Sequence, residues 1–187
     1  MKKSCIPQYV SQLTNILDTF DWTTLSAFTE IMFKAWQEQR NIFICGNGGS
    51  AGNANHIAND FSYGVNPTGK AFNVESLSAN SAIITCLAND TGYDNIYAQQ
   101  LFNKGKPGDI LIVLSGSGNS ANILSVLEQA KSLNMTSCAI LGFTGGKAKE
   151  MADHPLHFAI NDMQIAEDLQ LIVGHMLMKD LHALISN

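Results

Sequence analysis

Apolar positions along the chain follow two patterns that alternate from one segment to the next. Five short apolar runs are typical of buried strands, and they lie at residues 42–46, 72–77, 110–114, 137–142 and 156–160. Five longer segments repeat apolar residues at helical spacing, and they span about 50–63, 80–102, 119–133, 145–152 and 163–186. Strands that alternate with helices predict a parallel sheet with right-handed crossover connections.

Two further helices are predicted before the first strand, within residues 1–40. The first carries apolar residues at helical spacing, namely Tyr9, Leu13, Ile16 and Leu17. Asp21 or Thr23 can cap the second. The pair either covers its own sheet or packs against another subunit. Only 14% of the residues are charged, and so little charge favours a surface that other subunits cover.

The fold class predicted by this order is α/β: a three-layer α/β/α sandwich with a five-stranded parallel sheet, similar to flavodoxin. A chain of 187 residues, 45% of them hydrophobic, fits one domain with a sizeable core. We therefore expect a single domain over residues 1–187, with the helical pair at 1–40 and the α/β core at 41–187.

The composition argues against several classes of function. The net charge is −5 and the Lys and Arg residues are scattered, so nothing indicates a nucleic-acid partner. No apolar stretch reaches about 18 residues, so no membrane span is expected. No apolar segment follows the basic N-terminus, which argues against a signal peptide. The four cysteines lack metal-site spacing, and a reduced, cytoplasmic protein is the simplest interpretation.

Two turns of small residues stand where strands run into helices. The first is Gly46–Ala51 and the second is Ser115–Ser120. Turns at the carboxyl ends of strands in an open α/β sheet share a crevice that binds ligands. The second turn combines three serines with free backbone N–H groups at a helix N-terminus, which favours a phosphate group over a simple helix cap. No lysine follows it, so it is not a P-loop.

Ionisable residues on two of the predicted helices can carry chemistry. His56 and Asp60 are four residues apart and share one helical face, which suits two metal ligands, an acid–base pair or a solvated ion pair. On the last helix, Glu167 or Asp168 can share a cavity with His175, because they lie about 80° and about 20° from it on the helical wheel. The alternative for His175 is a histidine in an apolar core.

Two weaker signals remain. The first turn also fits the dinucleotide pattern G-x-G-x-x-G/A, with Glu75 near the position of a ribose-binding acid. That reading leaves the serine-rich turn unexplained. Residues 88–93 form a turn signal that is either a plain loop or a segment reaching over a ligand.

Taken in chain order, these segments resemble the sugar isomerase (SIS) domain family, most closely its phosphoheptose isomerase branch. The motifs that carry the resemblance are Gly46-Asn47-Gly48-Gly49-Ser50 with His56, Leu77-Ser78-Ala79-Asn80, Asn89-Asp90-Thr91-Gly92-Tyr93, Tyr97-Ala98-Gln99-Gln100, Ser115-Gly116-Ser117-Gly118-Asn119-Ser120 and His175-Met176-Leu177. They cover nearly the whole chain.

The resemblance implies an aldose–ketose isomerase that converts sedoheptulose 7-phosphate to a heptose 7-phosphate, a precursor of lipopolysaccharide and other surface polysaccharides. It implies a homotetramer with active sites at subunit interfaces and no nucleotide cofactor. The implied contacts to the sugar phosphate are Asn47, Gly48, Ser50, Asp90, Ser115, Gly116, Ser117 and Ser120.

The resemblance also implies a zinc ion or another divalent metal, with ligands at His56, Asp60, Glu167 and His175. Three residues depart from the branch: Asp60 stands for its Glu, Glu167 for its Gln and Gly116 for its Thr. We expect Asp60 to act as the catalytic base with His175 as its acid–base partner and Glu167 assisting. The alternative is a non-catalytic member of the family that binds sugar phosphates and acts through a protein partner, as one that binds a replication initiator does.

Overall fold

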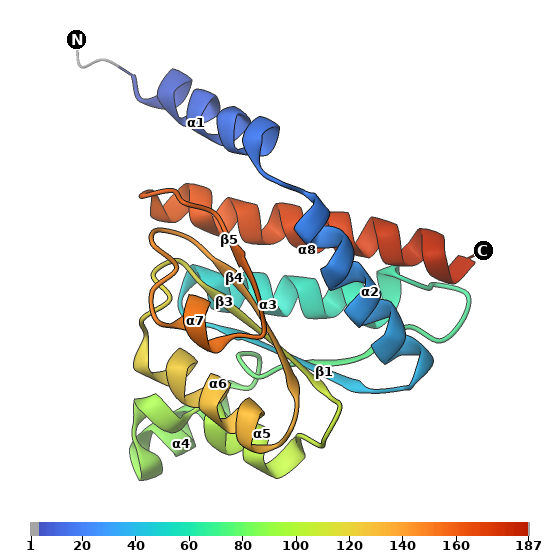
Figure 1. Cartoon of the computed structure of the whole chain (residues 1–187). Helices are drawn as coiled ribbons and strands as arrows, with labels where there is room; N and C mark the ends of the chain where they lie inside the picture. Colours follow the sequence, from blue (N-terminus) through green and yellow to red (C-terminus); the bar gives the residue numbers. More distant parts are fainter. Residues whose placement is uncertain (1–3, 187) are drawn as a thin grey trace.

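The computed structural model describes residues 4–186 and has five strands in one sheet (Figure 1). The strands are β1 (Asn41–Gly46), β2 (Asn73–Ser76), β3 (Ile110–Ser115), β4 (Thr136–Leu141) and β5 (His154–His157). The α-helices are α1 (Ile6–Thr19), α2 (Thr23–Gln37), α3 (Gly49–Asn59), α4 (Ser81–Thr91), α5 (Ala98–Lys104), α6 (Ala121–Ser132), α7 (Ala148–Met151) and α8 (Met163–Ser186). A π-helix, η1 (Asp60–Gly64), continues α3, and a 3₁₀-helix, η2 (Tyr93–Asn95), precedes α5.

All neighbouring strands are parallel, in the order β2-β1-β3-β4-β5. This is the flavodoxin-like order, and it places the carboxyl ends of β1 and β3 side by side at the point where the winding reverses. Ile44 of β1 pairs with Ile112 of β3. The predicted α/β sandwich is confirmed.

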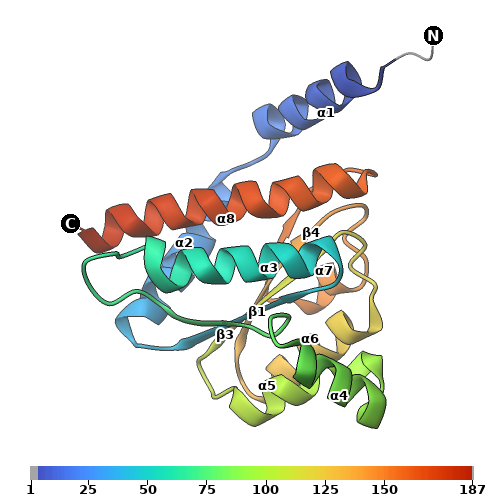
Figure 2. The ribbon, with the colours of Figure 1, turned by 180° about the vertical axis from the view of Figure 1, so that it is seen from behind.

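Helices cover both faces of the sheet (Figures 1 and 2). On one face α2, α3 and α8 pack Phe28, Ile57 and Leu169 against Ile112. On the other face α5, α6 and α7 pack against the alternate strand residues, such as Val113. Because the central strands are buried on both sides, they read as continuous apolar runs.

Two of the α-helices in the described part of the chain bury no residue of their own, α1 and α4. Helix α1 extends away from the three layers and lies near the start of α8 (Figure 1). Its Tyr9 hydroxyl donates to the carboxylate of Asp168 on α8. No helix within residues 4–186 is both long and apolar enough to cross a membrane.

The structure breaks one predicted helix, at 80–102, into α4, η2 and α5. Gly92 ends α4 with φ +87°, a left-handed conformation that no helix continues through. The helix expected at 145–152 is reduced to the single turn α7, because Gly145 and Gly146 also have positive φ. The last strand, β5, begins two residues before the predicted 156–160 run and ends at His157.

Candidate active site

The two turns meet over the carboxyl ends of β1 and β3 and enclose a cavity of about 250 Å³. Its lining comes from both turns and from the start of α8. The lining residues are Asn47, Gly48, Gly49, Ser50, Leu114, Ser115, Gly116, Ser117, Ser120, Met163 and Glu167. The structure therefore brings together every predicted sugar-phosphate contact except Asp90.

The second turn, Ser115–Ser120, which we call the serine turn, is shaped by hydrogen bonds within it and to the next loop. Ser115 Oγ accepts from the Gly118 N–H at 3.0 Å, and Gly118 has φ +66°. Asn119 ties the turn to the next loop, because its Oδ1 accepts from the Lys147 N–H at 3.1 Å. Ser120 is the N-cap of α6 but makes no side-chain capping bond. Its hydroxyl and the first N–H groups of α6 are therefore available to an anion.

The first turn is fixed from beneath by a buried hydroxyl network. Tyr97 donates its hydroxyl to the carbonyl of Gly46, and Ser78 Oγ accepts from the Gly46 N–H at 3.3 Å. Burial raises the pKa of the Tyr97 hydroxyl well above its usual range, which keeps it a donor. The turn thus has a fixed backbone from which α3 begins.

Glu167 occupies the start of α3. A Cβ added at Gly49 would lie 2.2–2.4 Å from the carboxylate atoms of Glu167, so any larger residue there would displace this carboxylate. A carboxylate at a helix N-terminus is stabilised by the partial positive charge of that end. The N-terminus of α3 therefore already has a carboxylate beside it.

The same carboxylate argues against the dinucleotide reading, in which a pyrophosphate would sit at the N-terminus of α3. Glu75, the candidate ribose-binding acid, forms an ion pair with Lys104 at 2.5 Å. The N-terminus of α3 and the Glu75 carboxylate therefore both already have partners within the chain.

Helices α3 and α8 run side by side from this cavity (Figure 2). A buried amide network joins them: Gln170 Nε2 donates to Ser50 Oγ at 3.0 Å, and Asn53 Nδ2 donates to Gln170 Oε1 at 3.0 Å. Further along, Gly174 lies against Ile57, where an added Cβ would come within 2.7 Å of its side chain. The glycine allows the two helices to approach closely. We call this line of contact the α3–α8 seam.

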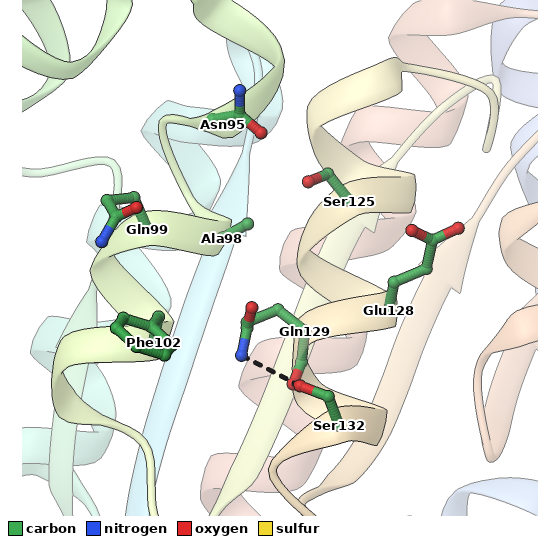
Figure 3. Close-up of a pocket in the computed structure, with 8 residues that line it drawn as sticks. All are labelled: Asn95, Ala98, Gln99, Phe102, Ser125, Glu128, Gln129 and Ser132. Carbon is green, nitrogen blue, oxygen red and sulfur yellow. Dashed lines mark hydrogen bonds between the residues drawn. The ribbon is translucent and has the colours of Figure 1, made fainter. Parts of the chain in front are cut away.

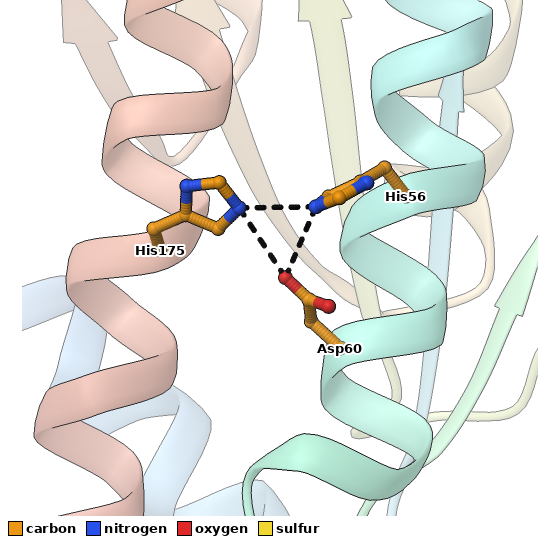
Figure 4. Close-up of side chains that lie close together, drawn as sticks. All are labelled: His56, Asp60 and His175. Carbon is orange, nitrogen blue, oxygen red and sulfur yellow. Dashed lines mark hydrogen bonds and ion pairs between the residues drawn. The ribbon is translucent and has the colours of Figure 1, made fainter.

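His56, Asp60 and His175 meet at the far part of the seam (Figure 4). The Nε2 atoms of His56 and His175 are 3.0 Å apart, and Asp60 Oδ2 lies 3.4 Å from the first and 3.5 Å from the second. Both histidine side chains are about half exposed, while Asp60 is 17% exposed. The π-helix η1 begins at Asp60 and continues the backbone of α3.

This cluster fits a divalent metal such as zinc. Ligands about 2.0–2.2 Å from a tetrahedral zinc ion lie about 3.3–3.5 Å from one another, close to the observed spacings. The three donor atoms all lie within 4.8 Å of one another. Three protein ligands with one open position are typical of catalytic rather than structural zinc sites.

Glu167 is not part of this cluster, contrary to the expected four-ligand set. Eight residues separate it from His175, or about 12 Å along the axis of α8, and its carboxylate faces Gly49 instead. Asp168 does not reach His175 either. It accepts a hydrogen bond from Tyr9, and this bond raises the pKa of the Tyr9 hydroxyl to about 12.

Asp90 lies at the end of α4, outside the cavity lining. It accepts from Cys86 Sγ at 3.5 Å and from the Asn89 side chain at 2.8 Å. The structure adds two residues to the site that the sequence did not single out: Asn122, which bonds to Asn47, and Met163, which lies against Gly116. Tyr93, from the segment 88–93 named in the sequence analysis, also bonds to Asn47.

A larger hollow of about 440 Å³ lies between α5 and α6 (Figure 3). Its lining consists of Asn95, Ala98, Gln99, Phe102, Ser125, Glu128, Gln129 and Ser132. Glu128 is the one ionisable side chain among these residues, so the hollow offers neither a metal set nor an anion site. The chemistry of the described chain is concentrated along the α3–α8 seam.

Comparison with known proteins identifies the family of this chain. The SIS domain model matches residues 8–142. A phosphoheptose isomerase of Clostridium acetobutylicum is 33% identical over 170 residues, which span 91% of this chain and 81% of that protein. The solved phosphoheptose isomerase of Francisella tularensis has the same fold, with a TM-score of 0.90 and 24% identity over 95% of this chain and 96% of that one. The solved phosphoheptose isomerase of Neisseria gonorrhoeae gives a TM-score of 0.88 and 23% identity, over 95% of this chain and 97% of that one. The chain belongs to the phosphoheptose isomerase branch of the SIS domain family.

Proposed function

We propose that this protein is an aldose–ketose isomerase that interconverts sedoheptulose 7-phosphate and a heptose 7-phosphate. One observation carries the proposal: an anion site and an acid–base cluster lie at two ends of one seam. Both turns line one cavity, and α3 begins there at Gly49, seven positions or about 10 Å along the helix axis from His56. An extended seven-carbon sugar phosphate has a comparable length.

The phosphate binds at the serine turn. Ser117 and Ser120 supply hydroxyl donors, and the first N–H groups of α6 supply backbone donors. None of the residues lining the cavity is a lysine or arginine. Neutral donors and the helix N-terminus therefore carry this interaction within the chain.

The sugar chain then follows the α3–α8 seam, which places C1 and C2 beside His56, Asp60 and His175. Isomerisation transfers a proton between these two carbons while a second proton moves between their oxygens. Asp60 serves as the base at carbon through its Oδ1 atom, whose one hydrogen bond among residues 4–186 is from Asn59 Nδ2 at 3.4 Å. In the metal-free site His175 Nε2 exchanges the proton at oxygen, and with a metal bound that nitrogen would hold the metal instead.

A divalent metal held by His56, Asp60 and His175 would act as a Lewis acid and stabilise the negative charge of an enediolate. Glu167 has a different role from the one expected, which was to bind the metal and assist proton transfer. Its position beside the serine turn suits a hydrogen bond to a hydroxyl near the phosphate end of the sugar rather than proton transfer at C1 and C2.

The assembly is proposed to be a homotetramer. Helices α1 and α4 bury no residues within one chain, and Ile6 and Val10 on α1 are 69% and 57% exposed. Apolar helices of this kind gain stability by packing against other copies. A cytoplasmic enzyme that supplies heptose precursors for surface polysaccharide is consistent with this substrate.

The direct test is turnover of sedoheptulose 7-phosphate by purified protein supplied with zinc, followed by NMR. We expect an aldose heptose 7-phosphate to form, and unphosphorylated sedoheptulose to react far more slowly. Ser120→Ala should raise KM by about tenfold, while Ser125→Ala, in the hollow between α5 and α6, should leave KM unchanged. Equal turnover of the two sugars would contradict the proposed phosphate site.

A further inference from the structure

The side chain of Asn47 is held by two residues from distant parts of the chain. Asn47 Nδ2 donates to Asn122 Oδ1 at 2.8 Å, and Asn122 Nδ2 donates back to Asn47 Oδ1 at 2.8 Å. Tyr93 adds a third bond, from its hydroxyl to Asn47 Oδ1 at 3.0 Å. Asn122 is 1% exposed, so this end of the network is buried in the protein.

The count of donors and acceptors fixes what Asn47 can offer a ligand. A carboxamide oxygen has two lone pairs, and here Asn122 and Tyr93 occupy both. The amide nitrogen has two hydrogens, and Asn122 takes one of them. Asn47 lines the cavity with one N–H left. It can therefore address a bound molecule only as a hydrogen-bond donor.

The structure places Tyr93 where it can control this orientation from the solvent side. Tyr93 is 53% exposed and begins η2 directly after Gly92, whose φ is +87°. If the amide of Asn47 were turned over, its N–H₂ group would face the donors of Asn122 and Tyr93, and the buried donor of Asn122 would be left unpaired. Leaving such a donor unpaired costs free energy, so the bonds to Asn122 and Tyr93 select one orientation of the amide. Without them, the amide could turn and present its oxygen.

We propose that Tyr93 and Asn122 are positioning residues that determine sugar specificity. They hold Asn47 as a donor toward an oxygen of the sugar chain between the phosphate and the reacting carbons. The inference rests on the proposed function, because it assumes a sugar phosphate in the cavity. It predicts a loss of discrimination between sugars rather than a loss of chemistry.

The test compares Tyr93→Phe and Asn122→Asp with the wild type. The phenylalanine change removes one donor to Asn47 Oδ1. The aspartate change replaces the other donor with an acceptor. For each variant we expect KM for sedoheptulose 7-phosphate to rise about five- to tenfold with kcat within about threefold. The preference for this sugar over fructose 6-phosphate should fall in both variants, and binding of inorganic phosphate to the Tyr93→Phe variant should stay within about twofold.

Tyr63→Phe is the matched control, because Tyr63 is 68% exposed and its hydroxyl makes no hydrogen bond among the described residues. Variants that discriminate between the two sugars as the wild type does would overturn this inference alone. A Tyr93→Phe variant whose binding of sugar and of inorganic phosphate weakens in parallel would also overturn it, since that indicates general damage to the cavity. A wild type that binds no sugar phosphate would overturn both this inference and the proposed function.

Discussion

The Nε2 atoms of His56 and His175 lie 3.0 Å apart, although 119 positions separate the two residues in the sequence. Helices α3 and α8 create this approach, and Gly174 makes room for it beside Ile57. Asp60 Oδ2 completes a triangle with the two nitrogens. Two half-exposed histidines and a mostly buried aspartate that converge at a helix seam are an arrangement suited to metal binding and proton transfer.

Metal binding should depend on the three residues of this triangle and not on Glu167. His175→Ala removes one of three ligands and should weaken zinc binding at least about tenfold. Glu167→Gln should leave the affinity within about twofold, because its carboxylate lies against Gly49 about 12 Å away along α8. Calorimetric titration of each metal-free variant with zinc measures its affinity for the metal.

His154→Ala is the control for the loss of a histidine, because His154 is exposed on β5 and outside the cluster. Zinc affinity that falls equally in the Glu167→Gln variant would restore Glu167 to the ligand set and contradict the three-ligand site.

The serine turn should tolerate a side chain at Gly116 but not at Gly118. A Cβ at Gly118 would lie 1.9 Å from the carbonyl oxygen of Gly145, and its φ of +66° disfavours other residues. Gly118→Ala should therefore cost about 2–4 kcal/mol of unfolding free energy and abolish phosphate binding. At Gly116 the added Cβ meets only the flexible end of Met163, at 2.5 Å, so Gly116→Ala should cost less than about 1 kcal/mol.

Thermal unfolding compares the stability of the Gly116→Ala and Gly118→Ala variants. Titration with inorganic phosphate compares their phosphate binding. Equal destabilisation would show that the contact between the serine turn and the Gly145 loop does not hold the phosphate site in shape.

The exposed thiol of Cys86 should react slowly with alkylating reagents. Its hydrogen bond to Asp90, together with the nearby negative charge, raises the pKa of the Cys86 thiol. A raised pKa leaves less of the reactive thiolate at any pH below it. Asp90→Asn should therefore accelerate labelling of Cys86 by iodoacetamide at mildly alkaline pH.

Mass spectrometry of labelled peptides resolves the four cysteines. Cys45 and Cys138 are buried and should remain unlabelled while the protein is folded, since burial raises the pKa of both thiols. Unchanged labelling of Cys86 in the Asp90→Asn variant would show that the contact does not form in solution.

The fold could be predicted from the sequence because the central strands are buried on both sides. The runs at 42–46 and 110–114 correspond closely to β1 and β3. Edge strands are less clearly marked: β5 is four residues long, and only Leu156 is fully buried. The break between α4 and α5 depends on the backbone conformation of Gly92, which apolar periodicity does not report.

The site was predictable in part. Spacing along one helix places His56 and Asp60 together, and the structure confirms that they meet. The helical wheel also placed Glu167 near His175, but a wheel records direction and ignores the rise along the axis. The pairing of Asn47 with Asn122 joins residues 75 positions apart, and it follows from the order of β1 and β3 in the sheet rather than from any local motif.

The central claim is that Asp60, in its triangle with His56 and His175, moves a proton at the carbonyl end of a sugar phosphate. The most direct measurement is deuterium incorporation at C1 and C2 of sedoheptulose 7-phosphate in deuterium oxide, with zinc supplied. The wild type should incorporate deuterium, and the Asp60→Asn variant should do so at least about 100-fold more slowly. A wild-type protein that binds the sugar phosphate without any exchange, or an Asp60→Asn variant that exchanges at the wild-type rate, would contradict that claim.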